Sequence, residues 1–174
     1  NNGGIDANGH LFELSGVIDG GGVLTITDSA GGGAVKLSGA NTYAGGTIVD
    51  GATVLLASAT GMTSGPLGTG TVTLTNGGTL QATFGEFYNN DIGLDANGGA
   101  LVADGNIVSF LGDISDGGTP GGLTINASGD TGTVYLSGNN TYTGGTTIAG
   151  GTVGVNSDNA LGDSSGAVVV DDGA

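Results

Sequence analysis

The sequence predicts an all-β protein built as a parallel β-helix, a solenoid of stacked coils with essentially no α-helix. Short runs of β-branched and aliphatic residues alternate with polar ones, and Gly, Asn, Asp or Ser separates the runs. A long segment of the chain is repeated: residues 33–56 and 132–155 align without gaps, with 14 of 24 positions identical. No segment has a sustained helical period, and Glu, Lys and Arg, which favour helices, are scarce.

Each expected strand is four or five residues long. In several of them the aliphatic side chains occupy every second position, as in Val35 with Leu37 and Val134 with Leu136, so one face of the strand is expected inside. Thr71, Thr73 and Thr75 are expected on the outer face. The nine expected strands cover residues 23–27, 34–37, 53–56, 71–75, 79–83, 122–126, 133–136, 152–155 and 167–170.

The uniform aliphatic character of the inward positions favours a solenoid over a sandwich or a propeller. With coils of roughly 20 residues, the 99-residue repeat would contain about five coils and the chain eight or nine, as a rod on the order of 40 Å long. We expect a single β-helix segment made of two related units, about 1–92 and 93–174, within a longer repetitive protein.

The charge of the chain excludes several classes of partner. The 174 residues include 41 Gly and 16 Asp and Glu, against one basic residue, Lys36, for a net charge of −15. Binding to nucleic acid or to an anionic membrane surface requires Lys and Arg, so neither partner is expected. There is no Cys, which excludes disulfides and thiolate sites. No apolar run is long enough for a membrane-spanning helix, so direct membrane insertion is not expected either.

Two copies of one motif carry a family resemblance. Residues 37–47 read LSGANTYAGGT and residues 136–146 read LSGNNTYTGGT. This pattern resembles the autotransporter passenger-associated strand repeat of large bacterial surface proteins. The resemblance implies a right-handed parallel β-helix, exported by type V secretion and displayed at the cell surface or secreted, with any membrane anchor outside this sequence. The first copy departs from the usual pattern at Ile48, where the second copy has Thr147.

The residues of the motif have expected structural roles. The side-chain amides of Asn41 and Asn140 would satisfy backbone groups of the turn, with a ladder of stacked amides along neighbouring coils as a further option. The rings of Tyr43 and Tyr142 would cover the turn with their hydroxyl groups in water. Val49 and Ile148 would face inward with Thr47 and Thr146. Positive φ angles are expected at the paired glycines of each tight corner, Gly45, Gly46, Gly144 and Gly145.

The sequence gives little support for a catalytic or metal-binding site. Asp residues occur at many turns, where capping explains them; calcium is the one possible cofactor, and no calcium-binding consensus is present. The pairs Asp113/Asp116 and Asp171/Asp172 resemble glycosidase acids, but neither has a His or Arg nearby. His10 is the single imidazole, and no nucleophile elbow accompanies it. Lys36 is expected to point outward, as is Tyr135 in the second copy.

One segment is a candidate contact site. Phe84, Phe87 and Tyr88 fall within five residues. They indicate either a patch for a glycan or protein, or a longer turn that covers the side of the β-helix. The threonine row of residues 71–75 would suit an ice-binding surface if it continued over many coils, which the sequence does not show.

Three functions remain open from the sequence. The favoured one is a non-catalytic rod of a bacterial surface protein, an adhesin that displays loops to cell-surface glycans or proteins. The second is a subunit that stacks on copies of itself in an extracellular filament or a biofilm matrix, because the ends of a β-helix are open. The third, disfavoured because a catalytic set is missing, is a polysaccharide-active enzyme.

Overall fold

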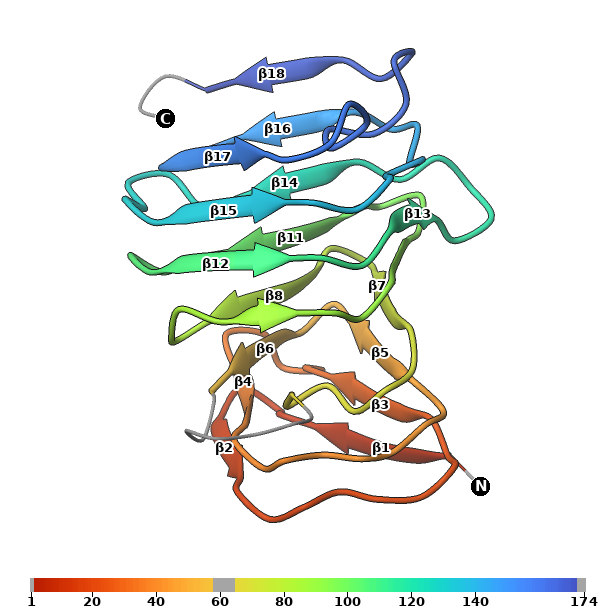
Figure 1. The fold of residues 1–174 in the computed structure, drawn as a ribbon. Coiled ribbons are helices and arrows are strands. Elements are labelled where there is room, and N and C mark those ends of the chain that lie inside the picture. The colour runs from red at the N-terminus through yellow and green to blue at the C-terminus, as the bar shows by residue number, and fades with distance from the viewer. Residues whose placement is uncertain (1, 58–64, 172–174) are drawn as a thin grey trace.

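The fold is a solenoid of about seven turns with three parallel sheets on its sides (Figure 1). It comes from a computed structural model that describes residues 2–57 and 65–171. Every pairing between the described strands is parallel, and none of the described residues is helical. Both features of the predicted fold class are therefore confirmed.

The sheets are called A, B and C in the order in which the chain meets them. Sheet A contains β1 (Gly3–Asp6), β3 (Leu24–Thr27), β5 (Thr47–Asp50), β7 (Val72–Thr75), β10 (Ile92–Leu94) and β13 (Ile114–Asp116). Sheet B contains β2 (Leu11–Leu14), β4 (Ala34–Leu37), β6 (Thr53–Leu56), β8 (Gly78–Ala82), β11 (Gly99–Val102), β14 (Leu123–Ile125), β16 (Thr146–Ile148) and β18 (Val168–Val170). Sheet C contains β9 (Phe87–Tyr88), β12 (Ile107–Phe110), β15 (Thr133–Leu136) and β17 (Thr152–Val155).

All nine predicted strands are present, each within one residue of its predicted bounds. The inward positions form continuous ladders, because equivalent residues of successive coils pair directly. In sheet B, Val35 pairs with Val54, and Val54 with Leu80; all three are fully buried. Val134 in sheet C is also fully buried. Thr71, Thr73 and Thr75 face outward as expected, but Thr73 pairs with Ile48 and Gly93, so the threonine row does not continue into a ladder.

The prediction of eight or nine coils of about 20 residues was wrong, because the coils are longer. The distance along the chain between paired residues ranges from 19, between Ala34 and Thr53, to 26, between Thr53 and Thr79. In sheet A, Thr47 pairs with Val72, and the column continues through Ile92 to Ile114. Thr141 N–H then donates to the carbonyl of Ile114, so four coils bring the chain to about residue 141. The 99-residue repeat is therefore longer than four coils by part of one turn.

Because of this excess, the strands of the second copy lie on the next sheet of the solenoid from the corresponding strands of the first copy. The first copy runs through β4, β5 and β6, on sheets B, A and B. The second copy runs through β15, β16 and β17, on sheets C, B and C. Equivalent residues such as Lys36 and Tyr135 thus lie on different faces of the molecule, although both point outward.

Candidate functional site

The two motif asparagines hold three coils together. Asn41 is fully buried; its Oδ1 accepts from the backbone N–H of Ile18 in the preceding coil (2.8 Å) and its Nδ2 donates to the carbonyl of Pro66 in the following coil (2.6 Å). Asn140 makes the same pair of bonds with Ile114 N–H (2.8 Å) and Ala160 C=O (2.6 Å). The predicted role in satisfying the backbone is confirmed. The partners are backbone groups, so these amides do not stack on other asparagines.

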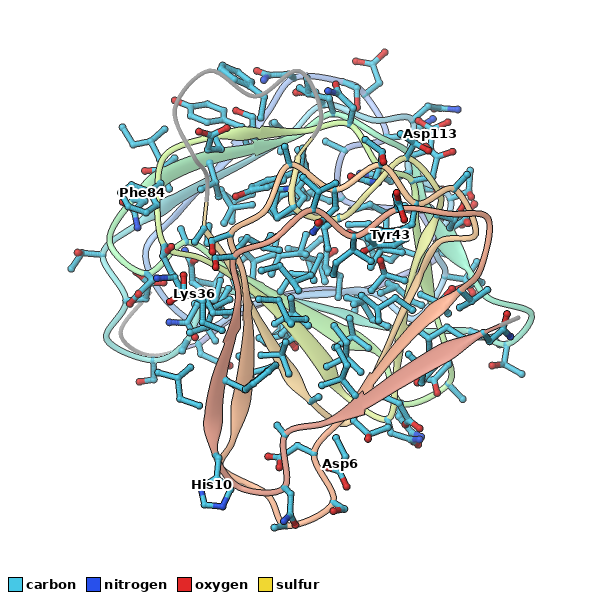
Figure 2. All side chains as sticks on the ribbon, turned by 90° about the horizontal axis from the view of Figure 1, so that it is seen from below. Asp6, His10, Lys36, Tyr43, Phe84 and Asp113 are labelled. Atoms are coloured by element: carbon cyan, nitrogen blue, oxygen red, sulfur yellow. The ribbon has the colours of Figure 1, made fainter. Side chains whose placement is uncertain are left out.

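The motif tyrosines are buried, which corrects the expectation that their hydroxyl groups lie in water. Tyr43 is 1% exposed and Tyr142 is 0% exposed, and Figure 2 shows Tyr43 inside the ring of strands. Each hydroxyl instead bonds the threonine four residues on, Thr47 or Thr146, at 2.6 Å. The interior tolerates a phenol here because the motif supplies this partner itself.

A three-residue segment of the following coil completes each motif. Thr47 Oγ1 donates to the carbonyl of Leu67 (3.4 Å), next to the Pro66 carbonyl that Asn41 binds. The ring of Tyr43 covers Gly68, where a Cβ atom would lie 3.1 Å from two ring carbons. The second copy repeats this arrangement on Ala160, Leu161 and Gly162. The similarity of 66–68 to 160–162 is visible in the sequence, but its role is defined by these contacts across coils.

The paired glycines of the motif serve two different purposes. Gly46 and Gly145 have positive φ angles, 89° and 85°, as predicted. Gly45 and Gly144 do not, which corrects the expectation for these two. A Cβ atom on Gly45 would lie 2.4 Å from the backbone of Gly22, and one on Gly144 would lie 2.4 Å from Gly121. These two positions require glycine because two coils approach closely there.

The candidate aromatic patch is divided between surface and core. Phe84 and Phe87 are 53% and 70% exposed, but Tyr88 is only 3% exposed and stacks on Phe110, with ring centroids 5.3 Å apart. The predicted alternative of a longer covering turn is wrong for Phe87 and Tyr88, because these two residues form strand β9 of sheet C. Alternation within a strand sends these two neighbours to opposite faces.

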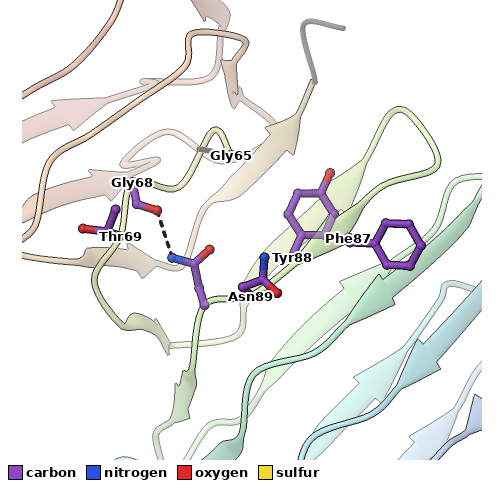
Figure 3. A pocket seen from close by; sticks show the side chains of 7 residues that line it. Gly65, Gly68, Thr69, Phe87, Tyr88 and Asn89 are labelled. Carbon is purple, nitrogen blue, oxygen red and sulfur yellow. Dashed lines mark hydrogen bonds between the residues drawn. The ribbon is translucent and has the colours of Figure 1, made fainter. Parts of the chain in front are cut away.

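A small hollow adjoins this strand. It has a volume of about 220 Å³ and is lined by Gly65, Gly68, Thr69, Phe87, Tyr88, Asn89 and Asn90 (Figure 3). Asn90 Nδ2 donates to the carbonyls of Gly68 (3.2 Å) and Gly70 (2.8 Å), which ties the lining to the preceding coil. Tyr88 Oη is buried and has no hydrogen-bond partner among the described residues.

The outer face of sheet C carries further exposed apolar side chains that the sequence analysis did not assign to a site. Phe87 pairs with Ser109, and Ser109 pairs with Tyr135, so these three side chains form one outward ladder. Ile107, two residues before Ser109, is 65% exposed, and Tyr135 is 36% exposed. We call Phe84, Phe87, Ile107, Ser109 and Tyr135 the aromatic face.

A wider groove lies beside the outer face of sheet B. Its volume is about 700 Å³, and it runs between strands β8 and β11 and the turn at 126–131. Thr79, Gln81 and Ala100 are among its neutral lining residues. The carboxylate of Asp130 is occupied by the backbone N–H groups of Asp104, Gly105 and Gly132. This groove therefore offers small side chains but no ring or buried polar group directed at a ligand.

Comparison with known proteins identifies the motif. Residues 30–56 and 130–155 both match the family model of the passenger-associated transport repeat. Two segments of the chain thus match this repeat, and we refer to them below as the two repeats. Over 92 residues, 47% of the chain, it is 39% identical to the adhesin BmaC autotransporter of Brucella suis biovar 1 (strain 1330). The aligned region is 3% of that protein's length. No solved structure matches the chain significantly.

The passenger-associated transport repeats contribute only part of the aromatic face. Tyr135 belongs to the second repeat, whereas Phe84, Phe87, Ile107 and Ser109 lie between the two. The Leu-Gly segments that the motif residues bind in the following coil also lie outside the matched ranges. Each repeat thus makes contacts with a Leu-Gly segment of the following coil that the family model does not include.

The candidate catalytic carboxylates are engaged in turns next to the repeats. Asp113 accepts from Asn139 N–H (2.7 Å), and Asp116 accepts from Gly121 N–H (2.9 Å) and from the hydroxyl of Thr143 (2.7 Å). Partial burial raises the pKa of Asp116, but these hydrogen bonds outweigh it, so its pKa lies below the usual value. A general acid needs a raised pKa instead. Asp171 is exposed, and Asp172 lies outside the described residues.

The remaining single residues lie at the surface. His10 is exposed at a corner between sheets A and B (Figure 2). Lys36 points outward as predicted, and its Nζ lies 3.4 Å from Glu13 Oε1. Within the described ranges, no three His, Asp or Glu side chains are grouped so that they could hold a metal ion. In the same ranges, no helix is long and apolar enough to span a membrane.

Proposed function

We propose that the chain is a non-catalytic rod of a secreted or surface-displayed autotransporter passenger, and that it mediates contact with cell-surface glycans or proteins. The observation that carries the proposal is the presence of two passenger-associated transport repeats inside one parallel β-solenoid. The similarity to an autotransporter adhesin supports the same role. The candidate catalytic carboxylates Asp113 and Asp116 accept hydrogen bonds from backbone N–H groups, which favours a structural function without a cofactor.

Binding of the purified chain to cells tests this proposal. We expect fluorescently labelled protein to bind a panel of eukaryotic and bacterial cells saturably, and unlabelled protein to compete. Heat-unfolded protein serves as the matched control for charge and composition. Absence of saturable binding on every surface, or release of reducing ends from a polysaccharide panel, would contradict the proposal.

A further inference from the structure

The exposed rings of the protein are concentrated on one side. Four of its eight aromatic residues are exposed, and three of those four, Phe84, Phe87 and Tyr135, lie on the side of sheet C. The fourth, Phe12, lies on the first strand of sheet B. The outer positions of sheet C between the rings carry no charge: Ser109, Thr133 and Thr152 are neutral. In a chain with a net charge of −15, the paired outer positions of sheet C are thus uncharged along the solenoid axis, and Glu86, next to Phe87, is a carboxylate at the edge of this stripe.

The orientation of Tyr135 is fixed by a glycine. A Cβ atom on Gly154, which pairs with Tyr135 in the next coil, would lie 2.1 Å from Cδ1 and 2.2 Å from Cε1 of the ring. The ring therefore lies flat against the backbone of the next strand. Gly154 covers part of the ring, and the Tyr135 side chain remains 36% exposed.

The two repeats differ at both positions that create this arrangement. The first repeat has Lys36 where the second has Tyr135, and Leu55 where the second has Gly154. Lys36 and Leu55 also pair across neighbouring coils, so the two sites are equivalent in register. The second repeat thus has a ring together with the one residue type that lets the ring lie flat. The remaining motif residues, which form the interior, do not need this change.

We propose that the aromatic face binds a neutral polysaccharide, with pyranose rings stacked on Phe87 and Tyr135 and the sugar chain parallel to the solenoid axis. Two rungs separate these side chains, ~9.6 Å, comparable with the length of a disaccharide. The hydroxyl of Ser109 lies between them and bonds no other described residue, which leaves it available to a sugar hydroxyl. This inference rests on the proposed function, because it assigns the contact surface and the ligand class.

The size and charge of the face favour a glycan chain over other partners. Sheet C has four strands of at most four residues, so its outer face measures about 19 Å by 13 Å, roughly 250 Å². A stable protein–protein interface needs about 800 Å² from each partner. A strongly acidic molecule also repels uronic, sulfated or phosphorylated sugars, and this leaves neutral sugars.

Affinity electrophoresis of the whole chain tests the proposal. The gels contain cellulose-, chitin- or β-1,3-glucan-derived neutral polymers, or polygalacturonate as the anionic comparison. We expect retardation by at least one neutral polymer, and about tenfold weaker retention for Phe87→Ala and Tyr135→Ala, as for the loss of one stacking ring. Gly154→Ala should weaken retention while Tyr135 is kept, because the three atoms nearest to the new methyl group all belong to the ring of Tyr135.

Two variants serve as controls. Tyr135→Phe keeps the ring and should retain binding, and Val17→Ala removes an exposed apolar side chain outside sheet C and should have no effect. Circular dichroism of each variant checks the fold. The proposal is overturned if no neutral polymer retards the protein, if the three variants bind as the parent does, or if polygalacturonate binds best.

Two further measurements separate this inference from the alternatives. A dimer in sedimentation velocity that Tyr135→Ala abolishes would assign the face to a second copy and overturn the proposal. In the cell assay, binding that is equal for the parent and Tyr135→Ala would overturn the inference and leave the proposed function intact. Glycan retention without any cell binding would support the inference and contradict the proposed contact with cells.

Discussion

Tyr43 and Tyr142 show how one side chain joins two coils of the solenoid. Each phenol is enclosed by its own coil and by the glycine of the next, and each hydroxyl bonds a threonine that in turn donates to a leucine carbonyl. Burial raises the pKa of Tyr142 to about 12 in spite of this bond. The ring fills the interior and the hydroxyl defines its position.

Removal of that hydroxyl should cost a single hydrogen bond. We expect Tyr142→Phe to lower the free energy of unfolding by about 1 kcal/mol, because Thr146 keeps its bond to Leu161. Urea unfolding followed by circular dichroism measures the change. Tyr135→Phe, at an exposed ring, is the control and should unfold as the parent does. Equal losses in the two variants would show that the buried hydroxyl contributes nothing specific.

Asn41 should be more sensitive, because two backbone groups depend on it. Asn41→Ala leaves the N–H of Ile18 and the carbonyl of Pro66 without this partner in a buried site, so we expect a loss of about 2–4 kcal/mol. The same urea experiment measures it. Asn97→Ala, which removes an exposed side chain from a turn, should change stability by less than about 0.5 kcal/mol. A loss for Asn41→Ala as small as this would refute the role in joining coils.

At the scale of the element, close approach between two coils limits which residues fit at the corners. The strands use ordinary aliphatic residues, whereas the corner at Gly45 admits no side chain because the preceding coil lies against it. The close approach is a property of two coils together. It follows from the stacking distance and not from the conformation of the turn itself.

We therefore expect Gly45→Ala to destabilise the protein although φ at this residue is not positive. The new methyl group would meet the backbone of Gly22 at 2.4 Å, and a backbone shift of this kind costs about 1–3 kcal/mol. Thermal unfolding compares this variant with Gly16→Ala. No atom lies within 4 Å of a Cβ atom placed on Gly16, so no loss of stability is expected there. If both variants melt together, the coils do not approach as closely as described.

The strands show how much local sequence determines. Ala34–Leu37 and Thr133–Leu136 were predicted with their exact bounds, because alternation in four residues is a local signal. Nine of the eighteen described strands were not predicted, and β9 is one of them, since two residues, Phe87 and Tyr88, are too few to show a period. Its existence depends on Phe110 and Ser109 in the next coil. The split of the aromatic patch could not be predicted for the same reason.

At the scale of the whole molecule, the contacts of the motif threonines with the following coil were also beyond the sequence. Thr47 and Leu67 are 20 residues apart, and only the coil length brings them together. Coil length itself varies from 19 to 26 residues, so neither the register nor the number of turns follows from a fixed period. The candidate glycan surface depends on this register, since it joins Phe87 to Tyr135 across 48 residues.

The molecule as a whole should be sensitive to alkali. Burial raises the pKa of Tyr43, Tyr88 and Tyr142, three of the four tyrosines, above the ordinary value of 10. Because the folded state holds these protons more tightly, their contribution to stability is complete below pH 10 and is lost as the pH rises further. We expect the urea midpoint to be constant between pH 7 and pH 9 and to fall above about pH 10.

Absorbance at 295 nm, read in parallel with circular dichroism, checks this expectation. Ionisation of the three buried phenols should coincide with the loss of β-structure, because unfolding exposes them. Complete and reversible ionisation of all four tyrosines in a protein that keeps its folded spectrum would contradict their burial.

The 99-residue spacing of the two repeats exceeds the length of four coils, and this difference has a geometric consequence. Equivalent positions of the two repeats are rotated relative to each other around the solenoid axis, so the repeats lie on different sheets. A flat surface that touches Tyr135 meets β15 but not its sequence counterpart β4, which lies on another sheet. Duplication of the repeat in this chain therefore does not place a second copy of a binding residue on the same sheet. The outward residues of each sheet can differ independently of those on the other sheets.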